Sequence, residues 1–289
     1  MAKFTFTSAL GEVLSLTDGE NFKLINIDGQ TAAAASLSTL VTGGVDGDTV
    51  NSSQTQPRPI VLDLRITDKV EQTKRELLQI IKLKQQATLT WTQDERKLVI
   101  KGTVENIELP RWTNQCLMQV TIHCSQPFWE TADYIITELR EFISLHYFTD
   151  FENDMLYFPE GGIPFGVFDT TKTQSYYNSG DVAVGLEIEI EALSTCTNPI
   201  IYDREGNFFG CGYGTGNKQI VMQAGDIITI NTRKNQKSAK LNGVSILGKI
   251  KPQSTWLQLL TGNNTFSFNS DEDTLSNMRI TMTYKQLYV

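Results

Sequence analysis

The chain offers few side chains for nucleophilic or acid–base catalysis. It contains two histidines, His123 and His146, and Cys124 directly follows the first of them. Neighbouring residues of a strand point to opposite faces, so His123 and Cys124 are not expected to form a catalytic pair. Pairing with a distant residue stays open, but a structural role for His123 is favoured.

A glycine-rich segment at 209–219, FGCGYGTGNKQ, is the sharpest local motif. A phosphate-binding P-loop requires a lysine where this segment has Asn217, and a strand rather than a helix is expected after it. The glycine spacing also differs from the dinucleotide-binding fingerprint. We therefore predict a glycine-rich strand or hairpin that packs closely against another chain, and no cofactor.

The acidic segment DFEND at 150–154 has the spacing of a calcium-binding loop over its first residues. The sixth position, which requires glycine, is Met155, and the twelfth is Gly161 rather than an acid. A solvated acidic turn is therefore predicted, and no metal site. No pair of carboxylates stands out as an acid–base couple, so no catalytic residues and no enzymatic activity are predicted.

Two aromatic residues of the second half, Tyr213 and Trp256, are able to stack on a sugar ring if they are exposed. They give the alternative function, a carbohydrate-binding β-sandwich protein that recognises bacterial cell-wall polysaccharide. Packing of both rings in a core is the more common arrangement.

Composition narrows the class of protein. The 289 residues are 40% hydrophobic, which is typical of a globular protein, and the net charge is −8. The 25 Lys and Arg form no dense basic stretch, so specific nucleic-acid binding is not expected. Neither a signal peptide nor a membrane-spanning run is evident, which predicts synthesis in a cytoplasm without membrane insertion.

The cysteines form no C-x-x-C pair and are expected to be free, buried thiols. They are Cys116, Cys124, Cys196 and Cys211.

Period-2 alternation dominates the first half and predicts strands. Residues 60–66 place Ile60, Leu62, Leu64 and Ile66 on one face, and 22–28 alternate before a turn at Asp28-Gly29. The polar stretch between about 29 and 59 is predicted to be a loop or flexible arm. Its role is left open.

One segment, at about 68–86, has helical spacing instead. Its apolar positions include Val70, Leu77 and Ile81, and Asp68 with Glu71 resembles a capping box. A helix of about five turns that packs one apolar stripe on a sheet is predicted. Residues 133–148 show both spacings and stay ambiguous between helix and strand.

From residue 180 onward, short β segments alternate with turns such as Asn242-Gly243 and Gly225-Asp226. The fold class is therefore mainly β, with a β-sandwich or barrel-like domain that carries one helix (1–130) and a second β-sandwich of jelly-roll type (131–289, core about 178–289).

The segment HCSQPFWET at 123–131 ends the last long strand of the first domain. Pro127 is expected to stop the strand ladder, and Phe128 and Trp129 to pack over the end of the first domain.

The order of these features resembles the distal tail protein (Dit) family of siphophages and phage-tail-like bacteriocins over nearly the whole chain. The residues that carry the resemblance are Cys124, Pro127, Phe128 and Trp129, then Asn178, Gly180 and Asp181, then Asn198 and Pro199, and finally Asn242 and Gly243.

The resemblance implies a structural hub at the virion tail tip, assembled in the bacterial cytoplasm as a homo-hexamer. The first domain is expected to form the ring, with the tail tube protein on one side and the tail-associated fibre or spike protein on the other. The second domain is implied to be galectin-like, with receptor-binding proteins as further partners. An acidic ring also suits the passage of DNA.

Overall fold

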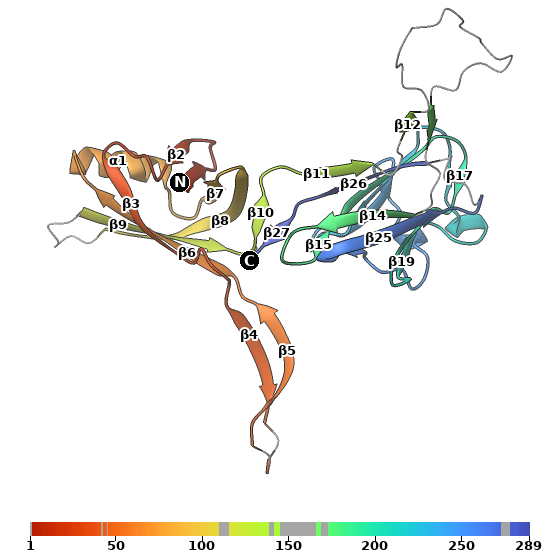
Figure 1. Ribbon diagram of the computed structural model, residues 1–289, viewed down its shortest axis with the longest axis horizontal. Helices are drawn as coiled ribbons and strands as arrows, with labels where there is room; N and C mark the ends of the chain where they lie inside the picture. The colour runs from red at the N-terminus through yellow and green to blue at the C-terminus, as the bar shows by residue number, and fades with distance from the viewer. Residues whose placement is uncertain are drawn as a thin grey trace, which may run out of the picture. The chain divides into compact units, whose positions relative to one another are not determined.

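A computed structural model describes residues 2–41, 43–44, 46–109, 116–138, 142–144, 166–168, 173–272 and 278–289. It divides into unit 1, Met1–Asp133 with Leu287–Val289, and unit 2, Tyr134–Gln286 (Figure 1). The last three residues thus lie in unit 1, whereas the sequence predicted a second domain that continues to 289. The cause is a short final strand that pairs with the strand beginning at Trp129.

The predicted class, mainly β with one helix, is confirmed for the described residues. The elements of unit 1 are β1 (Lys3–Ser8), β2 (Val13–Ser15), β3 (Phe22–Asp28), β4 (Ala35–Leu40), β5 (Thr49–Thr55), β6 (Arg58–Ile66), α1 (Val70–Ile80), β7 (Gln86–Gln93), β8 (Arg96–Glu108), β9 (Cys116–Cys124), β10 (Trp129–Thr131) and β27 (Leu287–Tyr288). No helix in this part of the chain or in the rest of the described ranges has the length and hydropathy needed to cross a membrane.

The main sheet of unit 1 is antiparallel and has the strand order β2-β1-β7-β8-β9-β6-β3, while β10 pairs with both β8 and β27. The four apolar residues predicted on one face of β6 are all buried, and β9 buries Met118, Val120 and Ile122 in the same manner. Period-2 alternation therefore identified the core face of these strands.

In β3 the alternation fails at its centre. The pairing with β6 shifts register between Leu24 and Asn26, so Ile25 is an extra residue that bulges from the ladder. Ile25 is 48% exposed, whereas Leu24 and Ile27 both pack against the core. The regular alternation expected over 22–28 is therefore wrong, because a bulge moves the following residues to the opposite face.

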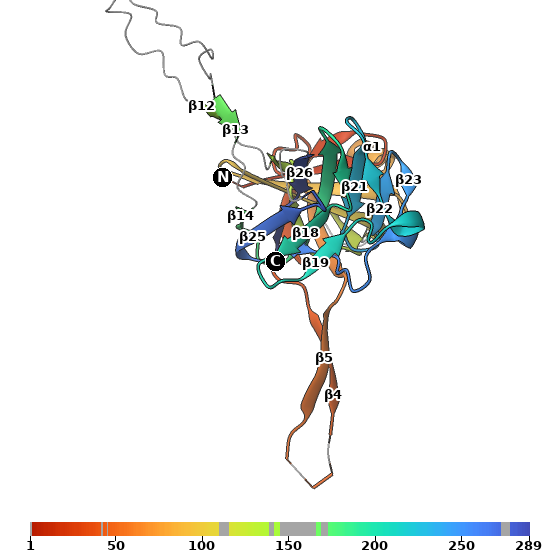
Figure 2. The same cartoon turned by 90° about the vertical axis from the view of Figure 1, so that its right-hand side faces the viewer.

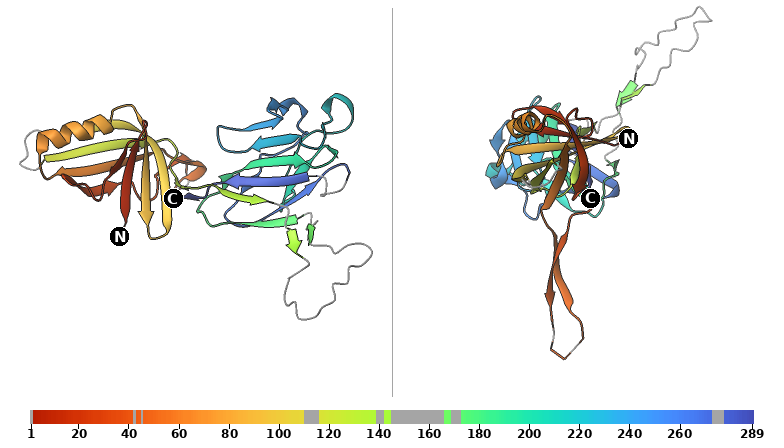
Figure 3. Two further views of the ribbon diagram at one scale, coloured as in Figure 1. Left: turned by 90° about the horizontal axis from the view of Figure 1, so that it is seen from above. Right: turned by 90° about the vertical axis from the view of Figure 1, so that its left-hand side faces the viewer.

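The helix is shorter than predicted. It spans Val70–Ile80 and lies along one side of the strands (Figure 3). The capping box does not form, because Lys69 occupies the N-cap position with a left-handed backbone and no side chain caps the helix. Glu71 instead pairs with Lys74 at 3.1 Å. Beyond Ile81 the chain turns at Lys84, whose amide donates to the Val104 carbonyl and so ends the helix at the sheet.

The predicted loop at 29–59 is a two-stranded ribbon, which we call the arm (β4, β5 and their connection). The arm projects away from the remainder of unit 1 in two perpendicular views (Figures 1 and 2). Every residue of β4 and β5 is exposed. At its root Gly29 has φ +78°, and a Cβ there would lie 2.2 Å from the Pro59 carbonyl oxygen. Only glycine suits this position.

Unit 2 contains a six-stranded sheet, β11-β26-β16-β21-β22-β23, and a four-stranded sheet, β14-β25-β18-β19. Their bounds are β11 (Ile135–Glu138), β14 (Thr173–Asn178), β16 (Glu187–Ala192), β18 (Ile200–Asp203), β19 (Phe208–Gly210), β21 (Ile227–Asn231), β22 (Ser238–Leu241), β23 (Val244–Ser245), β25 (Gly262–Asn269) and β26 (Met278–Tyr284). Shorter elements are β12 (Phe142–Ser144), β13 (Gly166–Phe168), β15 (Val184–Gly185), β17 (Cys196–Thr197), β20 (Val221–Met222), β24 (Gln258–Leu259) and the 3-10 turns Gly216–Lys218 and Leu247–Lys249.

Both sheets bury alternate residues. Ile188 and Ile190 of the six-stranded sheet are buried, and so are Phe266 and Phe268 of the four-stranded sheet. The ambiguous segment 133–148 begins as strand β11 and includes β12, whereas His146 and the acidic segment 150–154 lie outside the described residues.

The apolar segment that follows β9 places Trp129 in the core of unit 1. After β9 ends at Cys124 the chain resumes pairing at Trp129, which is 1% exposed, and Pro127 is buried while Phe128 is only partly buried. The Trp129 ring lies edge-on to Trp91, with centroids 6.0 Å apart. Its Nε1 donates to the Gln30 carbonyl at the root of the arm, at 3.3 Å.

We predict that Trp129→Ala lowers the free energy of unfolding of unit 1 by about 3–5 kcal/mol, because it leaves a large cavity. Trp129→Phe, which loses mainly the hydrogen bond, should cost less, about 1–2 kcal/mol. Chemical denaturation of the full chain measures both, with Val244→Ala at an exposed position of unit 2 as control. Equal stability of Trp129→Ala and the parent would show that the ring is not part of the core.

Candidate functional site

Two of the motif residues of unit 1, Cys124 and Trp129, lie at the root of the arm. Cys124 pairs across the ladder with Arg58, which is 1% exposed. The Arg58 Nη1 donates to the Gln30 carbonyl at 3.3 Å, the oxygen that also accepts from Trp129. Burial lowers the pKa of Arg58 and raises that of Cys124 to about 11. This cluster fixes the arm to the sheet and leaves its thiol protonated.

The neighbouring His123 faces the other side of β9. Its side chain is partly exposed while Cys124 is fully buried, as the alternation of a strand requires. His123 lies beside Lys84 and Glu105 at a shallow pocket of about 360 Å³. The two residues therefore do not form a cysteine–histidine pair at this position.

Asn178 holds the entry to unit 2. It is 1% exposed, its Nδ2 donates to the carbonyls of Val182 (3.1 Å) and Leu259 (3.3 Å), and its Oδ1 accepts from the Gly180 amide at 2.9 Å. Asp181 of the same motif is exposed. The side chain of Asn178 thus replaces backbone partners in a turn.

Asn198 organises the glycine-rich segment 209–219. Its backbone is left-handed (φ +49°), its Oδ1 accepts from the Ile220 amide at 3.0 Å, and its Nδ2 donates to the Gly214 carbonyl at 3.2 Å and to Asp271 at 2.6 Å. A Cβ at Gly212 would lie 2.3 Å from Asn198 Oδ1. Gly212 thus admits the close approach of an asparagine of the same chain. Packing of another chain against the segment stays a prediction.

The adjacent Pro199 is buried, and its carbonyl accepts the Cys211 amide at 2.8 Å. This bond joins the beginning of the glycine-rich segment to the residue before β18. Burial raises the pKa of Cys211 to about 12 and that of Cys196 to about 11.

Asn242 and Gly243 form the two-residue turn between β22 and β23, with φ of +48° and +82°. Both positive values are those of a type I′ turn, for which Asn-Gly is the preferred sequence. Asn242 also accepts from the Ile227 amide (2.9 Å) and donates to Asp226 (2.7 Å). Hydrogen bonds from the Gln223 amide and Asn242 lower the pKa of Asp226.

The two candidate sugar-stacking residues lie in different surroundings. Trp256 is partly buried against Phe209, with ring centroids 5.0 Å apart, and the Lys237 Nζ lies 5.7 Å from its ring. Tyr213 lies in the glycine-rich segment, where its amide donates to the Lys218 carbonyl. No ring contact between Tyr213 and Trp256 occurs in the described chain, so they do not form one platform.

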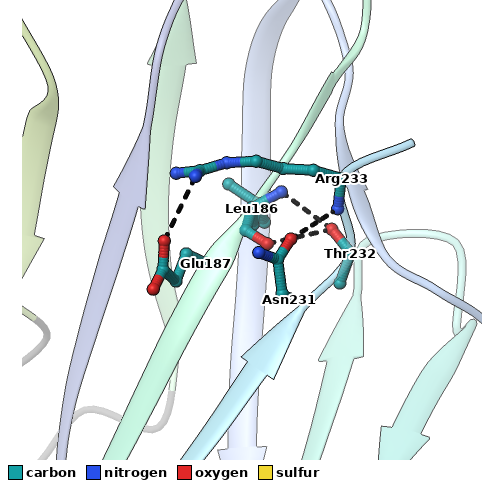
Figure 4. A network of polar contacts seen from close by, with 5 residues as sticks. All are labelled: Leu186, Glu187, Asn231, Thr232 and Arg233. Atoms are coloured by element: carbon teal, nitrogen blue, oxygen red, sulfur yellow. Dashed lines mark hydrogen bonds and ion pairs between the residues drawn. The ribbon is translucent and has the colours of Figure 1, made fainter. Parts of the chain in front are cut away.

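A polar network around Thr232 was not foreseen from the sequence (Figure 4). The Thr232 hydroxyl accepts from the Leu186 amide at 2.7 Å and donates to the Leu186 carbonyl at 3.2 Å. Arg233 pairs with Glu187 at 3.2 Å. A buried threonine between the partly buried Asn231 and Arg233 has no distinctive sequence pattern, because its partners are backbone atoms.

The arm has a surface of unusual composition. Leu37, Leu40, Val41 and Val50 are 52–73% exposed. Neither β4 (ASLSTL) nor β5 (TVNSSQT) contains a charged residue. Soluble proteins commonly protect exposed strands with charges or proline, and the arm has neither in these strands. Chemically, the arm is suited to strand pairing and apolar contact.

We predict that Asn198→Ala lowers the free energy of unfolding of unit 2 by about 3 kcal/mol, because it leaves a buried amide unpaired and puts alanine in a left-handed backbone. Asn207→Ala is the matched control: Asn207 also bonds a carboxylate, Asp203, but is exposed, so about 0.5 kcal/mol is expected. Denaturation of both variants measures the difference. Similar costs would show that Asn198 does not organise the segment.

We further predict that one of the four thiols, Cys116, reacts rapidly with a thiol reagent at about pH 8, because it alone is partly exposed. Burial raises the pKa of the other three, so their thiolates form only when the pH rises through those raised values. Absorbance of the released reagent counts the reactive thiols. Rapid reaction of all four in the folded protein would contradict the buried placement.

Comparisons with known proteins agree with this arrangement. Residues 10–124 match the phage tail protein RIFT-related domain, and residues 179–288 match the siphovirus-type tail component, C-terminal domain. A search of curated proteins finds no significant match.

Among solved structures, the crystal structure of SPP1 Dit, described as a paradigm of the hub adsorption apparatus in phages that infect Gram-positive bacteria, is 14% identical with a TM-score of 0.67 and 99% coverage of both chains. Two structures of the phage P2 baseplate in its activated conformation, with Ca and with Sr, are more distant (11% and 10% identity, TM-scores 0.45 and 0.46, 98% of each chain).

The two domain models match in succession along one chain, and the fold is that of SPP1 Dit over almost its whole length. The chain therefore belongs to the distal tail protein family of siphophages, whose members are structural components of the phage tail.

Proposed function

We propose that this protein forms a homo-hexameric ring at the virion tail tip, assembled in the bacterial cytoplasm. Unit 1 builds the ring, contacts the tail tube protein on one side and carries the tail-associated fibre or spike protein on the other. Unit 2 is a mount for receptor-binding proteins. The role is structural rather than enzymatic.

The arm is the observation that carries this proposal. An isolated two-stranded ribbon is marginally stable in water, and this one also exposes four large apolar side chains. If another polypeptide covers the ribbon, the ribbon gains stability and its apolar side chains are removed from water. A second copy of the chain is the partner that a closed ring supplies to every arm.

Unit 1 also offers open strand edges to such a partner. The main sheet ends at β2 on one side and at β3 on the other. Val13 of β2 is 67% exposed and Ile25 of β3 is 48% exposed, so each edge presents apolar surface. A neighbouring arm that adds to one of these edges satisfies backbone groups and buries aliphatic side chains together.

The negative net charge supports a role as a channel through which DNA passes. Each copy has a formal net charge of −8, so a ring of such subunits repels DNA rather than retaining it. The known relative SPP1 Dit is described as part of a hub adsorption apparatus, which agrees with this role.

We predict that the purified protein forms six-fold rings in electron microscopy, with a native mass six times that of the chain. The double variant Leu37→Lys, Val50→Lys should remain folded but shift to the monomer, because it places charges on the covered ribbon. Val244→Lys is the control, since Val244 is more exposed than Leu37 or Val50 but lies in unit 2.

A parent protein that stays monomeric at high concentration with and without its tail partners would contradict the ring. Rings that persist in the arm variant would show that the arm does not join the copies.

A further inference from the structure

The four-stranded sheet of unit 2 has one face in the core and one face directed outward. In β14 the residues at alternate positions are exposed, while Tyr176 and Asn178 between them are buried. The register of the ladder places further residues of β25, β18 and β19 beside them. We call this surface the outer face; it consists of Thr173, Ser175, Tyr177, Asn263, Thr265, Ser267, Tyr202 and Phe208.

The outer face carries hydroxyls, one amide and aromatic rings, and these eight residues include no charged side chain. The six-stranded sheet of the same unit provides an internal comparison. Its outward positions hold the charged residues Glu138, Glu187, Glu189, Glu191, Lys240 and Arg279. Exposure to solvent alone therefore does not explain why the outer face is neutral, because the solvent-exposed face of the six-stranded sheet carries many charged residues.

The aromatic rings stand at two corners of the outer face. Tyr177 is 63% exposed at the end of β14. Tyr202 and Phe208 lie side by side on paired strands, with centroids 6.0 Å apart, and the Lys251 Nζ lies 5.2 Å from the Phe208 ring. Thr173, Ser267, Tyr202 and Phe208 form one row across four strands, which spans about 14 Å at the usual strand spacing.

Between the rings lie groups that both donate and accept hydrogen bonds. Ser175 Oγ and Thr265 Oγ1 are 3.5 Å apart on neighbouring strands, and Asn263 is opposite Tyr177. A sugar presents the matching chemistry: C–H faces that stack on aromatic rings and hydroxyls that exchange hydrogen bonds with hydroxyl and amide groups. A polyanionic polymer does not match, because the eight residues of the outer face supply no cation and the neighbouring Lys251 Nζ lies over the Phe208 ring.

We propose that the outer face binds a neutral polysaccharide, with Tyr177 and Tyr202 as stacking residues and the hydroxyl row as hydrogen-bonding partners. The site is distinct from Tyr213 and Trp256, and it does not depend on ring assembly. It gives unit 2 a direct contact with a glycan surface in addition to a mount for other proteins.

The test is a titration of the full chain with neutral oligosaccharides built from glucose, galactose, rhamnose or N-acetylglucosamine, followed by saturation-transfer NMR and calorimetry. Saturable binding of at least one of these probes is expected. Tyr177→Ala and Tyr202→Ala should each lower its affinity by about five- to tenfold, which is the loss of one ring contact.

Two controls locate the site. Glu189→Gln on the six-stranded sheet and Trp256→Ala should leave the affinity unchanged. A poly(glycerol phosphate) probe should bind more weakly than the neutral probe. Absence of saturable binding to every neutral probe, or binding that is lost in Trp256→Ala but kept in Tyr177→Ala and Tyr202→Ala, would overturn the proposal. Ring formation is measured on the same samples. Rings without sugar binding would refute the glycan site alone, and sugar binding without rings would refute only the proposed hub.

Discussion

Burial of one indole ring at the closure of unit 1 is the constraint on which the rest of that unit depends. Trp129 packs against Trp91, donates to the Gln30 carbonyl and begins the strand with which β27 pairs. Three separate segments therefore meet at one side chain: the root of the arm, the exit toward unit 2 and the returning end of the chain. Because Arg58 donates to the same carbonyl, the arm begins from a fixed point although its own strands have no core.

The parts of the fold that the sequence could predict are those in which burial of one face determines the residue pattern. Residues of β6 and β9 alternate strictly because one face is buried along their whole length, so their pattern reports their structure. The helix pattern was correct in kind but too long, since the turn at Lys84 is imposed by a backbone bond to the sheet. The bulge at Ile25 and the pairing of the arm depend on partners that a one-dimensional pattern does not contain.

The motif residues of unit 2 show a different limit. Asn178, Asn198 and Asn242 each hydrogen-bond to backbone atoms, and two of them have positive φ. Asparagine at a turn and asparagine at a ligand site look alike in a sequence, because the amide serves both purposes. The structure separates the two uses, since the partners of these amides are loops of the same chain. The motifs therefore describe the backbone of unit 2 rather than a reactive centre.

The strands of the arm and the outer face both lack charged side chains, but the two surfaces suit different partners. The arm exposes aliphatic side chains and the free backbone edges of two strands, and both are relieved by another polypeptide. The outer face of the four-stranded sheet has its central strands paired and presents hydroxyls with aromatic rings, which suit a hydroxylated ligand.

An added strand would form few new hydrogen bonds on the outer face, where the backbone is already bonded. A sugar gains little on the arm, which has no aromatic ring in β4 or β5. In the proposed roles, attachment between copies and contact with a glycan use separate units, so each surface can change in sequence without loss of the other.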